Sequence, residues 1–251
     1  MSDLELLSDL HRDGARQGPG GDDETRLALE LSGLRGGAGL RIADVGCGTG
    51  ASTRVLAREL DASVTAVDFL PEFLRELEAA AAREGLGDRI QTLAAPMEAL
   101  PFADGSLDAI WSEGAIYDMG FGAGVRARRR FLKPGGAPAV SELTWLTRDR
   151  PEELTRHWAA EYPEVDTAAA KMAVLEAAGF SPLGYFPLPR HCWLDNFYRP
   201  SQARFPAFLA RHGGSEAAKA VVAAEEVEIS LCERFADFVS YGFYVARRVG
   251  D

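Results

Sequence analysis

The sequence is short of positive charge. Its 251 residues include 27 lysines and arginines against 38 aspartates and glutamates, which gives a formal net charge of −11 at pH 7. A surface with this balance repels phosphate backbones, and it lacks the basic footprint that nucleic-acid binding requires. We therefore expect no nucleic-acid partner.

Cysteine is also scarce. Cys47, Cys192 and Cys232 are odd in number and widely spaced. This usage fits free thiols in a reducing compartment better than a disulfide framework or a zinc site. We therefore expect no metal centre.

Long apolar runs are missing as well. No window approaches the roughly 18–20 apolar residues of a membrane span. The N-terminal residues M-S-D-L-E lack the basic and apolar regions of a signal peptide. These absences predict a cytoplasmic protein without a membrane partner. Hydrophobic residues make up 47% and charged residues 26% of the chain, values typical of globular domains.

One glycine-rich loop carries the clearest sign of a ligand. Residues 40–45 have the length and apolar composition of a short buried strand. Gly46, Gly48 and Gly50 follow at alternate positions, and a helical pattern spans residues 52–60. Glycines let a ligand approach main-chain N–H groups closely, and the positive end of the helix points into the same space. We expect a nucleotide-like ligand over this loop.

Spacing alone allows a nicotinamide dinucleotide. The run Gly46-x-Gly48-x-x-Ala51 satisfies the dinucleotide fingerprint, and Asp68 follows roughly 20 residues later, at the end of a predicted strand. There the carboxylate would accept hydrogen bonds from both ribose hydroxyls. Alternatively, Asp68 would serve as the cap of the helix predicted over residues 71–84.

The full run from Asp44 to Gly50 resembles motif I of the class I S-adenosylmethionine (SAM) methyltransferases, in which an acidic residue precedes G-x-G-x-G. The run L-K-P-G-G at residues 132–136 is a second feature of that family. The run W-S-E-G-A-I-Y at residues 111–117 resembles a methyltransferase type 11-like group of bacterial small-molecule enzymes. The resemblance implies an α/β, Rossmann-like fold with a mostly parallel seven-stranded sheet and an antiparallel last strand. It also implies SAM as cofactor, bound by Asp44, the three glycines and Asp68.

The resemblance further implies that the chain is divided into two parts. An N-terminal helical cap or lid would cover residues 1–36, and a SAM-binding domain would cover residues 37–251, with a helical insertion at about 199–236. Gln17 and Gly18 lie in a polar, glycine-rich segment ahead of motif I, and we expect them to contact the cofactor. A flexible linker is the alternative interpretation.

The adenine side of the expected site departs from the family pattern. Residues 95–102, A-P-M-E-A-L-P-F, resemble the family's adenine loop, but Pro96 stands where an aspartate usually accepts from the adenine amino group. The Met97 N–H would still meet the ring, Phe69 would supply an apolar face, and Glu98 is the candidate for the missing acceptor.

Two further segments have simpler interpretations. The helix predicted over residues 125–132 carries four arginines, and we expect a solvated face there rather than a phosphate site. Residues 191–198 are rich in aromatics and are expected to form a connection before the helical insertion.

Methyl transfer needs a positioned acceptor and, where the acceptor arrives protonated, a general base. Glu113 and Glu142, each near the end of a predicted strand, and His191 are the candidate bases, and Glu113 is alternatively a contact for the methionine end of SAM. Tyr117 is a further candidate catalytic residue. Apolar walls for the acceptor are expected from Tyr117, Trp145, Trp193 and Tyr198.

The favoured function is methyl transfer from SAM to a small-molecule acceptor. Two alternatives stay open at this point: a nicotinamide-dependent oxidoreductase, and a SAM-binding protein without catalysis, which the proline in the adenine loop allows. The acceptor and the oligomeric state, a homodimer included, are not determined by these residues.

Overall fold

The computed structural model describes residues 3–250. Its centre is an eight-stranded sheet with the order β3-β2-β1-β4-β5-β8-β7, to which the short β6 is added beside β5. Neighbouring strands are parallel except at β8, which is antiparallel to β5 and β7. The strands are β1 (Leu40–Val45), β2 (Ala62–Asp68), β3 (Ile90–Ala94), β4 (Leu107–Glu113), β5 (Leu132–Trp145), β6 (Asp166–Thr167), β7 (Phe180–Pro187) and β8 (Val239–Arg248). The predicted sheet with an antiparallel last strand is confirmed, with the two-residue β6 as an addition.

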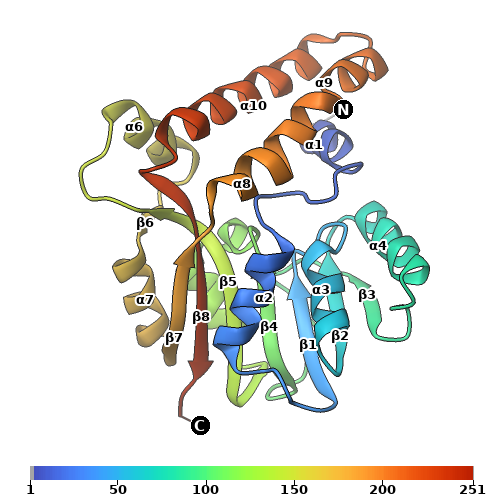
Figure 1. Cartoon of the computed structure of the whole chain (residues 1–251), viewed down its shortest axis with the longest axis vertical. Helices are drawn as coiled ribbons and strands as arrows, with labels where there is room; N and C mark the ends of the chain where they lie inside the picture. The colour runs from blue at the N-terminus through green and yellow to red at the C-terminus, as the bar shows by residue number, and fades with distance from the viewer. Residues whose placement is uncertain (1–2, 251) are drawn as a thin grey trace.

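Helices cover both faces of this sheet (Figure 1). Ile42 packs with side chains of α2 (Asp22–Ser32), α3 (Ala51–Glu59) and α4 (Pro71–Arg83). The next residue, Ala43, packs on the other face with α5 (Phe121–Arg129) and α7 (Ala168–Ala177). Because successive side chains of a strand point to opposite faces, a strand that is covered on both sides is apolar throughout. This explains why four of the six residues at 40–45 are apolar and lie on both faces of the strand.

A third group of helices, which we call the helical cap, lies above the carboxyl ends of the parallel strands (Figure 1). It has its own hydrophobic core, which also includes Leu143, Trp145 and Val239 from the upper ends of β5 and β8. Its members are α1 (Asp3–His11), α6 (Glu152–Glu161), α8 (Arg190–Trp193), the single π-helical turn η2 (Leu194–Tyr198), α9 (Arg199–Arg211) and α10 (Glu216–Phe235). The cap therefore closes the space above the sheet.

The arginine-rich helix differs from expectation. It begins at Phe121, after Gly120 with its φ of 77°, and Leu132 already pairs with Leu107 of β4. Arg128 is only 3% exposed, so the prediction of a solvated face is wrong for this residue. Burial lowers the pKa of its guanidinium to about 10. The helix turns this side chain inward, where its Nη2 lies 3.7 Å from the sulfur of Met97.

The connection expected at residues 191–198 is helical instead, so the helical insertion begins at Arg190 rather than near residue 199. Trp193, Phe197 and Tyr198 are buried together in the core of the helical cap. Burying these rings on one side of the chain requires helical spacing, which an extended connection would not provide.

Two observations complete the fold. Cys47 and Cys192 are buried, Cys232 is partly buried, and all three are free thiols. None of the helices within residues 3–250 combines the length and apolarity that a membrane span requires.

Candidate ligand-binding site

A cavity of about 810 Å³ lies between the sheet and the helical cap. Its floor is formed by residues at the carboxyl ends of β1, β2, β4 and β5, and its roof by α1, α6, η2 and α10. β1 and β4 are neighbours in the sheet, but α3, which follows β1, and α5, which follows β4, pack on opposite faces. Ligands of open α/β sheets bind at such a switch point.

The glycine loop after β1 forms one side of the cavity. The N–H groups of Gly46 and Cys47 both donate to the carbonyl of Val67, at 2.8 and 3.0 Å, which holds the loop against β2. Gly46 has a φ of 74°, and a Cβ there would lie 2.3 Å from the Cβ of Ala115. A glycine is therefore required at this position both by the backbone conformation and by the neighbouring loop.

Asp68, at the end of β2, faces the same space. Its carboxylate accepts hydrogen bonds from the N–H groups of Gly48 at 2.9 Å and Leu70 at 3.0 Å, one on each oxygen. The side chain does not cap α4, whose first residues receive no side-chain hydrogen bond, so the alternative of a helix cap is not what the structure shows. Burial raises the pKa of Asp68. Each carboxylate oxygen retains acceptor capacity for a further donor from the cavity.

Asp44 lies below the loop and does not line the cavity. It is fully buried, and one oxygen accepts from the hydroxyls of Ser52 at 2.8 Å and Thr53 at 2.7 Å. Desolvation raises its pKa to about 6. The first turn of α3 is thereby tied to β1, so this carboxyl supports the loop rather than contacting a ligand. Gly50, the N-cap of α3, also lies outside the cavity lining.

Residues 13–21, which we call the strap, cross over the glycine loop. Gln17 Oε1 accepts hydrogen bonds from the N–H of Thr49 at 2.8 Å and from its hydroxyl at 2.9 Å. The Gln17 amide in turn donates to the carbonyl of Gly14 at 3.0 Å. The side chain therefore joins the strap to the glycine loop, and Gln17 and Gly18 both line the cavity.

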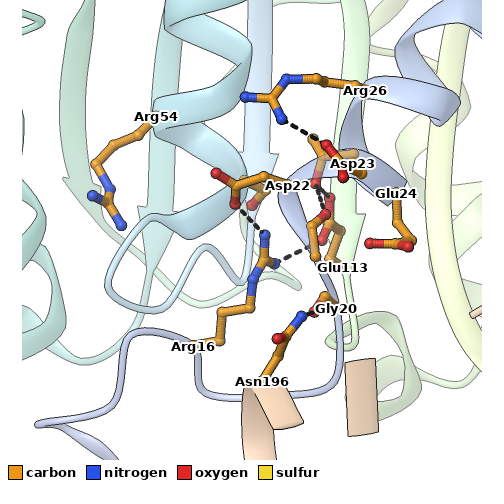
Figure 2. Close-up of polar contacts among 12 residues, drawn as sticks. Arg16, Gly20, Asp22, Asp23, Glu24, Arg26, Arg54, Glu113 and Asn196 are labelled. Atoms are coloured by element: carbon orange, nitrogen blue, oxygen red, sulfur yellow. Dashed lines mark hydrogen bonds and ion pairs between the residues drawn. The ribbon is translucent and has the colours of Figure 1, made fainter. Parts of the chain in front are cut away.

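Glu113, the last residue of β4, ties the strap and α2 to the sheet. Its Oε1 accepts from the Thr25 hydroxyl at 2.7 Å and from the Trp111 indole at 2.9 Å. Its Oε2 lies 3.3 Å from Arg16 Nη1. Figure 2 shows Arg16 extended between Asp22 and Glu113, and Asn196 of η2 holding Gly20 at the other end of the strap. Three protein donors thus occupy this carboxylate, which makes it an anchor rather than a free base.

The opposite side of the glycine loop is less polar. Phe69, Pro96 and Met97 line the cavity there, together with Glu98. Phe69 is 49% exposed, an unusual fraction for a large apolar side chain. This side offers apolar surface and one carboxylate to a flat ring.

The part of the cavity beneath the helical cap is acidic and aromatic, and we call it the acidic chamber. Its lining residues are Tyr117, Glu142, Trp158, Glu161, Tyr162, Trp193, Phe197, Glu225, Glu228 and Tyr241. They come from the 3₁₀ turn η1 (Ile116–Met119), the ends of β5 and β8, and four elements of the cap. The chamber therefore exists only because the cap folds down onto the sheet.

Glu142 is the most constrained of these carboxyls. It is 1% exposed, its Oε1 accepts from the N–H of Leu143 at 2.8 Å, and its Oε2 has no hydrogen-bond partner. Burial raises its pKa to about 7. The Tyr162 hydroxyl is close enough to influence that pKa but lies outside hydrogen-bond geometry, and it too has no partner.

His191 was predicted to be a catalytic residue, but it does not line the cavity. The structure therefore contradicts that prediction. Its side chain is 50% exposed on the outer side of α8, with Nε2 3.5 Å from Glu24 and 3.7 Å from the Cys192 sulfur. These three residues form a potential metal-ligand group in the described part of the chain. Their mutual contacts account for the arrangement without an ion.

The structure gathers most of the predicted site residues around one cavity. Those that line it are Gln17, Gly18, Gly46, Gly48, Asp68, Phe69, Met97, Glu113 and Tyr117. Of the predicted acceptor walls, Trp193 lines the cavity, whereas Trp145 and Tyr198 lie in the cap core. Sequence reasoning missed Arg16, Tyr162 and Tyr241, because no local pattern separates them from other polar or aromatic residues.

Comparison with known proteins finds similarity to methyltransferases over part of the chain. Residues 42–136 match the model of a methyltransferase domain. Over 168 residues the chain is 34% identical to a malonyl-[acyl-carrier protein] O-methyltransferase of Erwinia pyrifoliae, covering 62% of this chain and 60% of that protein. Over 107 residues it is 35% identical to the methyltransferase GfsG of Streptomyces halstedii, covering 42% of this chain and 38% of that protein. The chain thus spans less than two thirds of the length of these relatives.

A solved structure resembles the whole chain. The SAM-dependent methyltransferase from Geobacter sulfurreducens, determined with S-adenosyl-L-homocysteine, superposes with a TM-score of 0.80 at 19% identity. The superposition covers 97% of this chain and 96% of that one. At this identity the likeness establishes the fold, including the helical cap, and the site must be argued from this chain's own residues.

Proposed function

We propose, starting from the methyltransferase domain that residues 42–136 form, that this chain transfers a methyl group from SAM to a small-molecule acceptor. The observation that carries the proposal is the division of the single cavity. One part is bounded by the glycine loop, Asp68 and the strap, and the other is the acidic chamber. A cofactor and an acceptor can therefore meet within one cavity.

The residues around the glycine loop fit SAM. Gly46 and Gly48 line the cavity with their main chain, and Asp68 has an acceptor site free on each oxygen for the ribose hydroxyls. Phe69 and Met97 offer an apolar surface to the adenine. The fit supports the cofactor assignment, with Glu98 as the proposed acceptor for the adenine amino group.

The methionine end of SAM carries a carboxylate and an ammonium, so it calls for one positive and one negative partner. Arg16 and Glu113 supply this pair on the cavity wall, 3.3 Å apart. We assign Arg16 to the carboxylate and the Glu113 carboxylate to the ammonium. Glu113 is then a binding and anchoring residue, and its earlier candidacy as the general base is given up.

SAM supplies, when bound, a methyl group that is already activated by a positively charged sulfur. The task of this chain is to hold the acceptor in line with it, a contribution worth about 7–11 kcal/mol in well-oriented reactions. The strap and the helical cap cover the cavity, so water is excluded from the reacting groups. Tyr117, which lines the acidic chamber, is proposed to orient the acceptor.

The alternatives to methyl transfer make different predictions about binding. Titration calorimetry with SAM, S-adenosylhomocysteine and NAD separates them, and we expect binding of the first two alone. Release of S-adenosylhomocysteine in the presence of an acceptor panel then separates an enzyme from a SAM-binding protein without catalysis. Binding of NAD without SAM would overturn the proposal.

Three broader expectations remain proposals. Of the N-terminal part expected over residues 1–36, α2 packs on the sheet beside α3, whereas α1 belongs to the helical cap. The lid function accordingly rests on α1 and the strap. We also propose that the chain works in the cytoplasm, where its three thiols would stay reduced, on a small molecule rather than a nucleic acid, which its charge of −11 disfavours.

A further inference from the structure

The charged side chains that line the acidic chamber are all carboxylates. Glu142, Glu161, Glu225 and Glu228 all line it. The basic side chains that line the whole cavity, within residues 3–250, are Arg16 and His11. Arg16 is engaged by Glu113 and Asp22, and His11 lies 3.4 Å from Glu225. An anionic acceptor would meet carboxylates here without a free cation to receive it.

Aromatic rings form the remaining walls. Tyr117 and Tyr162 meet edge to face with centroids 6.2 Å apart, and Trp193 and Tyr241 do so at 4.8 Å. Aromatic faces attract organic cations, and the attraction grows where water is excluded. Carboxylates combined with aromatic faces thus favour an ammonium group over a neutral or anionic one.

Glu142, which lines this space, has a buried carboxylate oxygen without a hydrogen-bond partner. Glu142 lines the cavity while its side chain is 1% exposed, and its Oε2 receives no hydrogen bond. The Tyr162 hydroxyl and the Trp158 indole nitrogen are buried without a partner in the same region. Buried polar atoms in proteins are nearly always paired, so an unpaired carboxylate oxygen points to a donor supplied by a ligand.

Lys171 does not supply the missing hydrogen-bond donor to Glu142. Lys171 of α7 lowers the pKa of Glu142 by its charge, but its ammonium donates to the carbonyl of Glu164 at 3.0 Å and lies over the rings of Phe121 and Tyr162. Lys171 does not line the cavity. Neither Lys171 nor the neighbouring Tyr162 hydroxyl makes a hydrogen bond to Glu142 Oε2, so this oxygen has no partner among the described residues.

We propose that the methyl acceptor is an organic amine, which binds as its cation against Glu142 and the aromatic rings of the acidic chamber. The inference rests on the proposed methyl transfer and names the chemical class of its acceptor. Burial raises the pKa of Glu142 to about 7, which suits it to take up the proton that the amine must lose.

Methyl transfer to the amine conserves atoms and charge. The ammonium gives one proton to Glu142 Oε2, and the nitrogen lone pair this frees forms a bond to the methyl carbon. The carbon–sulfur bond breaks toward sulfur, which becomes a neutral thioether. The product is the methylated ammonium, and Glu142 returns its proton to solvent when the product leaves.

A matched set of probes tests the class of acceptor by binding. The protein is saturated with S-adenosylhomocysteine, which cannot donate a methyl group, and titrated at pH 7 with 2-phenylethylamine, 2-phenylethanol and phenylacetate. These share a phenyl ring and differ in charge. We expect the amine to bind at least tenfold more tightly than the other two. Glu142→Gln should remove most of this preference, whereas Glu233→Gln, an exposed position on α10 outside the cavity, should leave it unchanged.

The outcomes separate this inference from the function on which it rests. Binding of S-adenosylhomocysteine together with equal or weaker binding of the amine, or with no binding of any probe, overturns the amine assignment and leaves methyl transfer in place. Retention of the full amine preference in Glu142→Gln overturns the role of that carboxyl. Failure to bind S-adenosylhomocysteine overturns the proposed function, and with it the acceptor role of the chamber.

Discussion

Asp68 illustrates how one side chain can serve both the fold and a ligand. Its two oxygens hold the N–H groups of Gly48 and Leu70, which fixes the carboxylate in place before any ligand arrives. A carboxylate already fixed in this way loses little entropy when it accepts hydroxyl donors. The orientation toward the cavity is therefore built into the apo fold.

Asp68→Ala is expected to weaken SAM binding by roughly tenfold to several hundredfold, since each charge-assisted hydrogen bond contributes about 1.5–3 kcal/mol. Titration calorimetry measures the change, with circular dichroism to verify folding. Asp88→Ala removes an exposed carboxylate between α4 and β3 and serves as the control. Unchanged affinity in a folded Asp68 variant would contradict the ribose assignment.

Gly48 is required by its backbone conformation and by the close approach of Gln17, and a pair of variants can separate the two reasons. Its φ is 54°, and a Cβ there would lie 2.5 Å from Gln17 Oε1 of the strap. Gly48→Val should therefore displace the strap and abolish measurable SAM binding. Gly85→Val provides the control, because Gly85 has a φ of 70° but an open environment. Both variants should lose about 1–2 kcal/mol of stability from backbone strain, but only the first should lose SAM, as calorimetry would reveal.

Glu142 links stability to pH. Burial raises its pKa from 4.5 to about 7, so between these values the folded state binds more protons than the unfolded state. Stability is then lost as the pH rises through this window. The groups that influence this carboxyl are Lys171, Glu164, the N–H of Leu143 and the hydroxyls of Tyr117, Tyr162 and Tyr241.

Glu142→Gln removes this charge. We expect the variant to match the wild type near pH 4.5 and to be more stable by about 1–3 kcal/mol at pH 8. Urea unfolding at several pH values measures the difference. A gap that does not change with pH would show that the Glu142 carboxyl is not buried in its charged form at high pH.

The strap acts at the scale of an element. Two hydrogen bonds of Gln17 to Thr49, the ion pair of Arg16 with Glu113 and the bond from Asn196 to Gly20 hold it over the glycine loop. Truncating the chain before residue 21 would be a poor test of this element, because α1 places Leu6 and Leu10 in the core of the helical cap. A single substitution within the strap is sharper.

Gln17→Ala should release the strap without disturbing α1. We expect faster hydrogen exchange over residues 13–21 in the variant, and at least tenfold weaker SAM binding, because the strap covers the cofactor part of the cavity. In the wild type, S-adenosylhomocysteine should slow exchange in this segment. Gln91→Ala, at an exposed position of β3, is the matched control. If exchange in the strap is equally fast with and without ligand, the lid hypothesis fails.

At the scale of the whole molecule, the cavity lies between the sheet and the helical cap, whose hydrophobic cores are separate. The sheet packs against its flanking helices, and the helical cap packs largely upon itself. A ligand in the cavity contacts both. Its binding therefore stabilises the assembled state of sheet and cap, and the whole chain should respond to it.

Saturation with S-adenosylhomocysteine should raise the melting temperature by roughly 5–10 °C. At 100 times the dissociation constant a ligand adds about 2.7 kcal/mol, and each kcal/mol shifts a chain of this size by about 2–4 °C. Scanning calorimetry measures the shift, and the same concentration of NAD serves as the control. A melting temperature that stays constant would contradict cofactor binding to the folded state.

Local signals in the sequence determined the framework. The apolar runs at residues 40–45 and 90–94 predicted β1 and β3 with the bounds that the structure has. The glycine loop and Asp68 were identified as parts of one site. These predictions succeed because strands, turns and the order of βα units depend on neighbours within a few residues.

Tertiary structure alone decided what the side chains do. Glu113 was expected to be a base or a contact for the methionine end of SAM, and its partners Thr25 and Arg16, which lie 88 and 97 positions away, make it an anchor. Arg128 was assigned to solvent and is buried, and His191 was assigned to the site and lies outside it. Glu142, Tyr162 and Tyr241 meet only where β5, the segment after α6 and β8 converge. Burial, hydrogen-bond partners and pKa depend on contacts between distant segments, and the periodicity of a sequence carries no record of those contacts.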